Sequence, residues 1–409
     1  MHVLFITPYI PNSLRTRPYH LLKALACCHQ LTLLAPVFNR QEQADAARLA
    51  AEIPGLSVET VQCSKKAAIA HSLKALSKGL PMQARFCYSP ALLLRLEELA
   101  REKKFDVAHV EHFRAAYTGE RLAAIGLPAV WDSVDCISLL VQRTLRHGPL
   151  KNRAISVLEL NPSRRYERKL VVSAFFKQIC ATSAEDAAAL EELGGVSNGT
   201  IRVIHNGVAL DHFTPPTEPS AREDATVIFS GKLSYHANAA AARYLVEKVW
   251  GTVRREIPHA RLQLAGSNPS NDLLRLSGKA GIEVTGFVPD IAPLLRRATL
   301  AVAPMLYSVG IQNKVLEAMA CATPIIATHD VTRAIQVRDG IEIELVEQGN
   351  PAELARRIVE LLRDKRRATE MGHRGREYVA CHYNWAQAAR AIEEMWQLAV
   401  RHAAVIPVS

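Results

Sequence analysis

The sequence lacks the features that mark membrane-spanning, secreted and metal-binding chains. No apolar run approaches the roughly 20 residues of a membrane-spanning helix. The apolar segment His2–Thr7 is too short for the hydrophobic region of a signal peptide, and no cleavage-site pattern follows it. The eight cysteines are scattered and include no C-x-x-C pair, so neither a zinc site nor a disulfide framework is indicated. We therefore expect a cytoplasmic protein with reduced thiols.

Other absences narrow the function. The helix that follows the first apolar segment is not preceded by G-x-G-x-x-G, which disfavours a dinucleotide-binding enzyme. Aromatic residues make up 6% of the chain and no nucleic-acid-binding motif is present, so we expect no nucleic acid among the partners. No D-x-D lies in a loop suited to a divalent cation, and no metal site is predicted.

What the chain does have is size and positive charge. Its 409 residues exceed one ordinary hydrophobic core and predict two domains. An apolar content of 49% and a charged content of 22% are typical of a soluble globular protein. The formal net charge of +10 favours an anionic partner, such as an acidic lipid surface or a phosphorylated ligand.

One stretch in the second half predicts a strand, a loop, a helix and a second strand. Thr299–Pro304 is a short apolar run typical of a buried parallel strand, and the loop Met305–Gly310 ends in glycine. A helical pattern begins at Ile311 and stops at Pro324, and Ile325–Thr328 begins the next strand. Open α/β sheets bind ligands at such strand ends, where the free N–H groups of a helix N-terminus favour phosphate.

Two polar side chains on that helix, Lys314 and Glu317, share one face at a spacing of i, i+3. One interpretation is an ordinary surface ion pair. The other is a nucleotide diphosphate site, in which Lys314 meets phosphate and Glu317 accepts two ribose hydroxyls. A cation in the first turn of a helix is disfavoured by the helix dipole, and a bound anion would offset this. The preceding strand and glycine loop favour the diphosphate site.

These residues carry a resemblance to a known family. Gly310, Lys314 and Glu317, followed by Ala318-Met319-Ala320 and by Thr323–Ala327, resemble the donor-site signature of family 4 glycosyltransferases, which have the GT-B fold. The G-x-x-x-K-x-x-E form resembles that of bacterial exopolysaccharide glycosyltransferases. The family signature has two glutamates. The second matches Glu317 and the first falls on Val309, so the identity of the donor sugar stays open.

The resemblance implies an activity. It implies a hexosyltransferase that moves a sugar from a nucleotide diphosphate donor, UDP- or GDP-linked, to a glycan acceptor, with retention of configuration and without a cofactor or metal. A lipid-linked acceptor in exopolysaccharide or cell-surface polysaccharide synthesis fits this family. Two alternatives stay open: a catalytically silent, membrane-associated partner of a polysaccharide assembly complex, and a GT-B nucleotide-sugar epimerase.

The chain also shows the organisation that the resemblance implies. Strands and helices alternate along it, which predicts parallel sheets with helices on both faces. We expect two Rossmann-like domains facing across a cleft, with a C-terminal helix crossing back to the first. The proline-rich segment 214–224 predicts a linker. The first domain is then 1–213 with 385–409, and the second is 225–384.

Further donor-side residues follow other strands of the second domain. Gly231 and Lys232 come after the strand Thr226–Ser230, and Lys232 with Lys314 resembles the pair of basic residues that the family uses on the diphosphate. An exposed loop lysine is the alternative for Lys232. Asn238 is predicted to cap the next helix. Phe287 and Val288 lie in a turn that resembles the segment whose backbone contacts the nucleobase, and the helix N-terminus at Ile311 would also face phosphate.

The first domain gathers titratable residues after two predicted strands. His112 follows the strand 106–110, while Asp132 and Asp135 follow the strand 128–131. The family commonly places a histidine in the second loop, where this chain has Val134. We expect Asp132, Asp135 or His112 to assist the acceptor, a carboxylate being an adequate base if burial raises its pKa. The alternatives are a helix cap for Asp132 and a structural histidine.

Two groups of basic residues suggest acceptor-side contacts. Arg15 and Arg17 follow the first strand and would either hold an acceptor phosphate or be solvated. Two long helices are predicted between 136 and 176, and their segment 141–170 carries eight basic residues against Glu159 and Glu167. This segment is either a solvated helical face or a surface for anionic lipid, which would make the protein peripheral on the inner face of the cell membrane.

Overall fold

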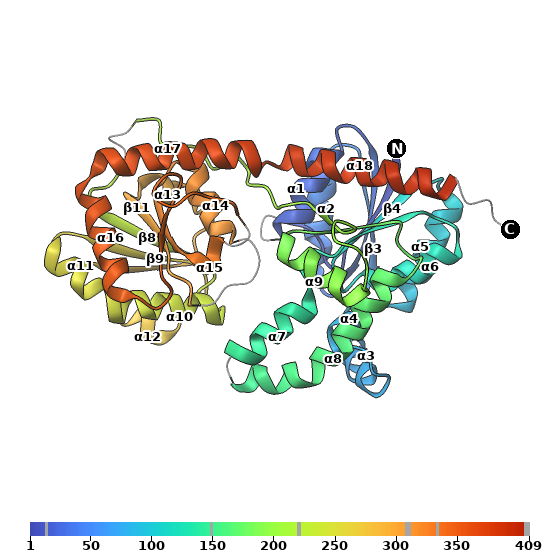
Figure 1. The fold of residues 1–409 in the computed structure, drawn as a ribbon. Coiled ribbons are helices and arrows are strands. Elements are labelled where there is room, and N and C mark those ends of the chain that lie inside the picture. The colour runs from blue at the N-terminus through green and yellow to red at the C-terminus, as the bar shows by residue number, and fades with distance from the viewer. Residues whose placement is uncertain (13–14, 148–149, 219–221, 307–311, 333–334, 405–409) are drawn as a thin grey trace. The chain divides into compact units, whose positions relative to one another are not determined.

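The computed structural model describes residues 1–12, 15–147, 150–218, 222–306, 312–332 and 335–404. The chain divides into two compact units, of which one comprises Met1–Asn206 and the chain from Trp385 onward, and the other Gly207–Asn384. Each unit contains one parallel sheet covered by helices (Figure 1). The predicted class, α/β with two parallel-sheet domains, is confirmed. The segment 214–224 lies within the second unit.

The sheet of the first unit has the strand order β3-β2-β1-β4-β5-β6-β7. Its strands are β1 (His2–Ile6), β2 (Gln30–Val37), β3 (Leu56–Gln62), β4 (Val107–Glu111), β5 (Ala129–Asp132), β6 (Gln178–Ala181) and β7 (Arg202–Val203). In the register of β4 and β5, Glu111 lies opposite Asp132. The polar residues after both strands therefore lie at one carboxyl edge of the sheet.

Helices cover both faces of this sheet. They are α1 (Thr16–Leu25), α2 (Arg40–Glu52), α3 (Lys65–Ser77), α4 (Met82–Phe86), α5 (Pro90–Glu102), α6 (Gly119–Ala124), α7 (Ile137–His147), α8 (Leu150–Val172), α9 (Ala184–Gly194) and α18 (Trp385–Ala404). The two long helices predicted between 136 and 176 are confirmed as α7 and α8.

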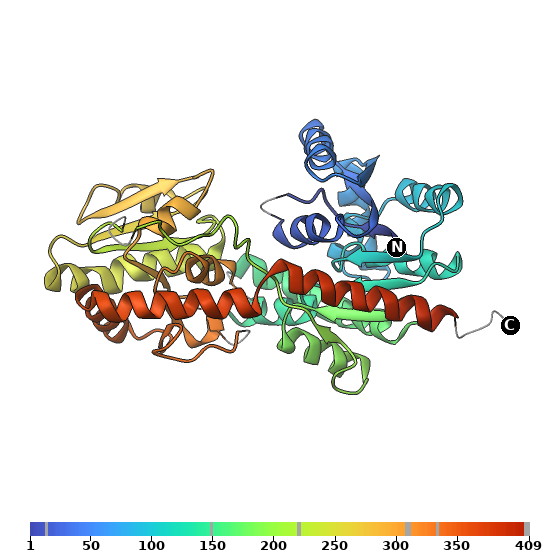
Figure 2. The same cartoon turned by 90° about the horizontal axis from the view of Figure 1, so that it is seen from above.

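The C-terminal helix returns to the first unit, as predicted. Ile392, Met395 and Trp396 of α18 are buried in one core with Val3 and Phe5 of β1. A second core lies on the other face of the sheet, around Trp131 and Phe113. Figure 2 shows the length of α18 along the first unit. The position of α18 follows from its apolar face, which carries Trp385 and Trp396 and buries both against the first unit.

The sheet of the second unit has the order β10-β9-β8-β11-β12-β13. Its strands are β8 (Thr226–Ser230), β9 (Arg261–Ala265), β10 (Ile282–Gly286), β11 (Leu300–Ala303), β12 (Ile325–Thr328) and β13 (Glu344–Val346). Its α-helices are α10 (His236–Tyr244), α11 (Gly251–Glu256), α12 (Asn271–Leu274), α13 (Ala292–Arg297), α14 (Asn313–Ala320), α15 (His329–Thr332), α16 (Pro351–Arg363) and α17 (Lys365–His382). A π-helical stretch, Leu245–Trp250, joins α10 to α11.

One predicted cap is wrong. Asn238 does not cap the helix after β8, because α10 begins two residues earlier, at His236, and Asn238 lies inside its first turn. Its side chain points back to the loop after β8 instead of to the helix's own N–H groups. The predicted strand-helix-strand stretch is present as β11, α14 and β12, with α14 starting at Asn313. Gly310 and Ile311 lie outside the described residues.

Among the described residues, no helix combines the length and the apolar character needed to cross a membrane. The same residues contain no cluster of three or more His, Cys, Asp or Glu side chains that could hold a metal ion.

Candidate functional site

The carboxyl edge of the second sheet brings Gly231 and Lys314 together. Gly231 follows β8 and Lys314 lies in α14 after β11, and these two strands are neighbours. The Lys314 Nζ donates to Asn238 Oδ1 at 2.6 Å and lies 4.8 Å from the centre of the Phe229 ring. A Cβ added to Gly231 would lie 3.2 Å from this Nζ. The backbone after β8, where Gly231 and Lys232 were predicted to contribute to the donor site, thus lies beside the Lys314 ammonium.

Glycine is required where the loops after β8 and β9 meet. Gly231 has φ +145° and Gly266 has φ +154°, values that side-chain-bearing residues rarely adopt. A Cβ on Gly266 would lie 1.8 Å from the Gly231 carbonyl oxygen, and a Cβ on Gly231 would lie 2.8 Å from Asn238 Nδ2. The Nδ2 of Asn238 donates to the Lys232 carbonyl at 3.0 Å. Asn238 therefore fixes both the loop after β8 and the ammonium of Lys314.

Lys314 and Glu317 are half-buried ionisable groups. Burial lowers the pKa of Lys314 to about 8, against the raising effect of Glu317. Burial raises the pKa of Glu317 to about 7, against the lowering effect of Lys314. Across the described residues, the Glu317 carboxyl group forms neither a hydrogen bond nor an ion pair. Buried charges normally have partners, so this pair is suited to a ligand that supplies them.

The other predicted donor-side residues lie at different depths. Lys232 is exposed and its ammonium has no ion-pair partner within the described ranges. Phe287 is 67% exposed, and it and Val288 follow β10, which is separated from β8 by β9. They lie at the same carboxyl edge but are not in the cluster around Lys314. The structure does not describe Gly310 and Ile311, so their predicted part in the site stays a prediction.

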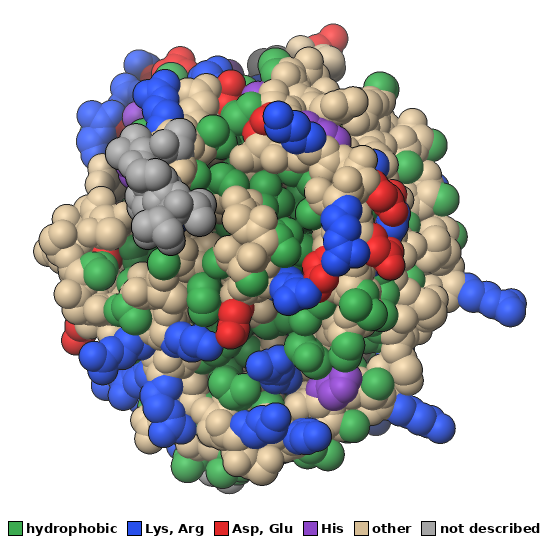
Figure 3. Space-filling model, turned by 90° about the vertical axis from the view of Figure 1, so that its right-hand side faces the viewer, with side chains coloured by type: hydrophobic (Ala, Val, Ile, Leu, Met, Phe, Trp, Pro, Cys, Tyr) green, Lys and Arg blue, Asp and Glu red, His purple; other side chains and the backbone are tan. Residues whose placement is uncertain are grey.

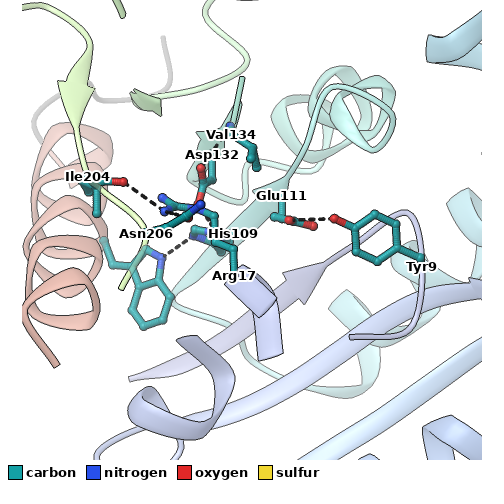
Figure 4. A network of polar contacts seen from close by, with 9 residues as sticks. Tyr9, Arg17, His109, Glu111, Asp132, Val134, Ile204 and Asn206 are labelled. Atoms are coloured by element: carbon teal, nitrogen blue, oxygen red, sulfur yellow. Dashed lines mark hydrogen bonds and ion pairs between the residues drawn. The ribbon is translucent and has the colours of Figure 1, made fainter. Parts of the chain in front are cut away.

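At the carboxyl edge of the first sheet, a buried ion pair joins α1 to β5. The Arg17 Nε donates to Asp132 Oδ2 at 2.7 Å, and both side chains are almost fully buried (Figure 4). The Arg17 Nη1 donates to the Ile204 carbonyl and to Asn206 Oδ1, both at 3.0 Å. The Arg17 Nη2 is buried without a hydrogen-bond partner in the described structure. Arg17 is therefore not a solvated loop arginine, and because its side chain is buried and paired with Asp132, it does not offer its charge at the surface to an acceptor phosphate.

Asp132 also fixes the loop that follows it. Its Oδ1 accepts a hydrogen bond from the Val134 N–H at 3.2 Å, and Val134 has φ +67°. A β-branched residue in this region is strained. The helix-cap interpretation of Asp132 is wrong, because α7 begins only at Ile137 and the carboxylate is directed to Arg17 and Val134. The Asp132 side chain thus fixes the backbone of Val134, the position at which the family commonly has a histidine.

His109 extends this network inside the first unit. Its Nδ1 accepts from Trp396 Nε1 at 3.2 Å, so its proton is on Nε2, which lies 3.8 Å from Asp132 Oδ2. Burial lowers the pKa of His109 to about 4, with Asp132 opposing this effect, so the ring is neutral near pH 7. Sequence reasoning missed both His109 and Trp396, since they lie inside a strand and a helix that otherwise carry core residues.

Glu111 is a buried carboxyl group beside this network (Figure 4). Tyr9 donates its hydroxyl to Glu111 Oε1 at 3.1 Å, while Oε2 has no hydrogen-bond partner in the described structure. Burial and the nearby Asp132 raise the pKa of Glu111 to about 8. Glu111 is thus protonated near neutral pH.

His112 and Asp135 differ in what they can do. The His112 Nδ1 accepts from the Arg114 N–H at 3.1 Å, and burial and Arg114 lower its pKa to about 3. The ring is therefore neutral with its proton on Nε2, and it can donate but is not available as a base. Asp135 keeps some exposed surface, and burial and Asp186 raise its pKa to about 7. Of the three predicted catalytic residues, only Asp135 combines an accessible carboxyl group with a pKa near neutrality.

Comparison with solved structures places this fold in a class. HepE from Anabaena, in a structure titled as a complex with UDP and glucose, superposes with a TM-score of 0.68 at 16% identity and covers 97% of this chain and 99% of its own. Sucrose-phosphate synthase from Thermosynechococcus elongatus superposes with a TM-score of 0.69 at 16% identity, covering 97% and 98%. The fold is that of the GT-B glycosyltransferases.

Sequence comparison gives the family. The model described as "Glycosyltransferase Family 4" matches residues 16–212, and the model described as "Glycosyl transferases group 1" matches residues 224–364. The chain belongs to the family 4 glycosyltransferases and is a hexosyltransferase. A D-inositol 3-phosphate glycosyltransferase of Catenulispora acidiphila is 25% identical over 347 residues, which cover 78% of this chain and 77% of the relative.

Proposed function

We propose that this glycosyltransferase moves a hexosyl unit, with retention of configuration, from a UDP- or GDP-linked donor to a lipid-linked glycan acceptor in exopolysaccharide or cell-surface polysaccharide synthesis. The observation that carries the donor half is the cluster of Gly231, Lys314 and Glu317 at one sheet edge. A nucleotide diphosphate supplies what these groups lack, namely phosphate oxygens for the ammonium and hydroxyl donors for the carboxylate. UDP is the first nucleotide to test, since HepE is described in complex with it.

The proposed chemistry of the donor side is stabilisation of the leaving diphosphate. Lys314, held by Asn238, meets one phosphate, and the exposed Lys232 reaches the other. Glu317 accepts the ribose hydroxyls, while Phe287 and Val288 contact the base and the helix N-terminus near Gly310 and Ile311 faces phosphate. Fixed positive charge at a developing anion lowers the barrier without a metal.

On the acceptor side we assign different roles to the three candidates. Asp135 assists deprotonation of the acceptor hydroxyl, because its pKa lies near neutral pH. Asp132 is a positioning residue, because its oxygens hold Arg17 and the Val134 loop. His112 donates a hydrogen bond from Nε2. The rate should therefore fall as the pH drops below about 7, where Asp135 takes up a proton.

The acceptor is the less constrained half of the proposal. The relatives named for D-inositol 3-phosphate suggest a phosphorylated polyol as a second candidate. A phosphorylated acceptor would be favoured by two free arginines, Arg15 and Arg17. Arg17, however, is buried against Asp132. Arg15 lies over the Tyr9 ring and donates to the Ile10 carbonyl. We therefore keep the glycan acceptor, with the protein in the cytoplasm and segment 141–170 against the anionic inner face of the membrane.

A thermal-shift experiment tests the donor half. The purified protein is heated with UDP, GDP, ADP or TDP and with their sugars, and one nucleotide should raise the unfolding temperature. A ligand at 100 times its Kd adds about 2.7 kcal/mol to the stability of the native state. Transfer of labelled sugar to a membrane extract is then measured with the selected donor. Stabilisation by none of the nucleotides would contradict the donor site, and conversion of the free UDP-sugar without transfer would favour the epimerase.

A further inference from the structure

The first unit has a second basic surface, which is separate from segment 141–170. No aspartate or glutamate occurs between residues 60 and 96, while six lysines and arginines do. Within α3 the buried positions are Ala68, Ser72 and Ala75. The opposite face of α3 exposes Lys66 and Lys74 together with two large apolar side chains, Ile69 at 54% and Leu73 at 61%. The outward face of α3 is thus both apolar and basic.

The lysines of this helix are free of counter-charges. Within the described structure, none of Lys65, Lys66, Lys74 and Lys78 has an ion-pair partner. An ordinary solvated helix would carry acidic residues at i+3 or i+4 to balance such lysines. The absence of acid here leaves the positive charge available to a partner.

The chain that follows the C-terminal end of α3 is hydrogen-bonded to α8. The Arg165 Nη2 donates to the Gly79 carbonyl at 3.5 Å, and the Met82 N–H donates to Glu159 Oε1 at 2.8 Å. Beyond these contacts α8 exposes Ile155, Val157 and Leu158. We call the exposed side chains of both helices the α3–α8 surface; it comprises Lys66, Ile69, Leu73, Lys74, Ile155, Val157, Leu158, Arg165, Arg168 and Lys169.

The two acidic residues of α8 do not reduce the charge of this surface. Glu159 and Glu167 are 2% and 0% exposed. Glu159 accepts the Met82 N–H, and Glu167 accepts the N–H groups of Ile137 and Ser138 at the start of α7. Both carboxyl groups therefore face the interior, so α8 itself adds no acidic charge to this surface. From outside the helix, Glu120 of α6 lies 3.6 Å from the Lys169 ammonium. Neither glutamate of α8 pairs with the basic residues of segment 141–170, so a solvated face of that segment would keep its positive charge.

Five of the large exposed apolar side chains of the described chain belong to the α3–α8 surface, and two more, Phe86 and Val172, lie on α4 and at the end of α8. Of the 13 large apolar residues that are exposed in the described chain, seven lie on α3, α4 and α8 (Ile69, Leu73, Phe86, Ile155, Val157, Leu158 and Val172). Figure 3 shows the outer face of the first unit, with lysine and arginine side chains gathered over its lower part and apolar side chains between them. Exposed apolar groups at such density indicate a binding surface.

We propose that the α3–α8 surface binds an anionic membrane, with α3 lying against the lipid headgroups. This rests on the membrane association in the proposed function and adds to it the helix α3, which carries its own charges and apolar anchors. Leucine and isoleucine would enter the headgroup region, while lysines on the same face meet phosphate and extend their apolar stems along the boundary. A nucleic acid could also bind the basic side chains of this surface, but it would not account for the exposed apolar side chains Ile69, Leu73 and Leu158.

The test measures co-sedimentation of the full-length protein with vesicles of phosphatidylcholine, with and without phosphatidylglycerol. The wild type should bind only the anionic vesicles. K66E/K74E should bind at least about tenfold more weakly, because each basic residue near an anionic surface contributes about fivefold. I69Q/L73Q should also weaken binding. All four residues are exposed, so the variants should melt at the wild-type temperature.

Matched controls lie at the opposite edge of the same sheet. The residues Arg101 and Lys104 precede β4, and Ile125 precedes β5, so they lie at the amino edge, whereas α3 follows the carboxyl end of β3. R101E/K104E and I125Q should bind the anionic vesicles as the wild type does. If the α3 variants bind like the wild type, or if the wild type ignores anionic vesicles, the proposal is overturned. UDP stabilisation and sugar transfer to a soluble acceptor, measured on the same samples, report separately on the proposed function.

Discussion

The carboxyl edges of the two sheets carry similar residues in opposite states. In the first unit, the cation Arg17 has a carboxylate, a carbonyl and an amide as partners, and only its Nη2 has none in the described structure. In the second, Lys314 has one amide oxygen and a sulfur atom, and the nearby Glu317 has no described partner. A buried charge that neighbours satisfy holds the fold, whereas one left with few partners is suited to a ligand. The contrast separates structural from ligand-binding charges better than residue type does.

Breaking the first edge should cost the most stability. Asp132→Asn leaves the Arg17 guanidinium buried without its counter-charge, and losing one member of a buried pair costs about 3–5 kcal/mol. The measurement is the free energy of unfolding in urea at pH 7. As a control, Asp135→Asn should not lower it and should tend to raise it, because burial raises the pKa of Asp135 to about 7, so its ionisation costs stability at pH 7, and its carboxyl group has no ion pair in the described structure. Equal effects of the two variants would contradict the contrast.

Breaking the second edge should remove activity without removing stability. Glu317→Ala should lower kcat/KM for the nucleotide sugar at least ~100-fold, because the ribose hydroxyls lose the carboxylate that accepts their hydrogen bonds. This corresponds to a loss of about 2.7 kcal/mol in transition-state binding. The urea midpoint should not fall, because burial raises the pKa of Glu317 to about 7 and its ionisation costs stability at pH 7. Glu347→Ala, at an exposed carboxylate of the same unit, should leave both quantities unchanged. Retained donor use by Glu317→Ala would show that the donor site lies elsewhere.

Lys314→Met should sharpen the comparison by stabilising the ligand-free protein while abolishing its stabilisation by UDP. Because burial lowers the pKa of Lys314 to about 8, keeping its charge at pH 7 costs about 1–3 kcal/mol. From pH 8 towards 10.5 the unfolded chain binds the extra proton, so wild-type stability rises and the gap to the variant should shrink. The gap is measured by thermal unfolding at pH 7 and 9.5. A less stable Lys314→Met variant at pH 7 would show that the ammonium is structural.

The smallest effect concerns strain at the first edge. Val134→Gly should raise the free energy of unfolding by about 0.5–1 kcal/mol, because glycine adopts φ +67° without the steric cost that valine bears. Val203→Gly, at an ordinary strand position of β7, should lower it. A loss of stability at Val134 would mean that side-chain packing outweighs the backbone strain.

The sequence predicted the parts of this molecule that depend on local pattern. Strand-helix alternation gave both sheets, and the spacing of Lys314 and Glu317 placed them on α14 beside a glycine loop. The pairing of Arg17 with Asp132 could not be predicted, since the residues are 115 positions apart and only the strand order brings them together. The inward direction of Glu159 and Glu167 depends on tertiary packing in the same way. For Asn238 the sequence predicted a helix cap, whereas its side chain instead accepts a hydrogen bond from Lys314, a contact 76 residues away that no local pattern reveals.

The return of α18 to the first unit has a consequence for synthesis on the ribosome. The His109 side chain in β4 accepts a hydrogen bond from Trp396, which is 287 residues further along the chain and is therefore synthesised much later. The apolar surface of β1 that Ile392, Met395 and Trp396 cover is made first and stays open while the whole second unit is translated. Domains usually fold as they emerge, at about 5–20 residues per second. Here the nascent first unit must remain incomplete for tens of seconds, during which it offers an apolar face that a chaperone would recognise.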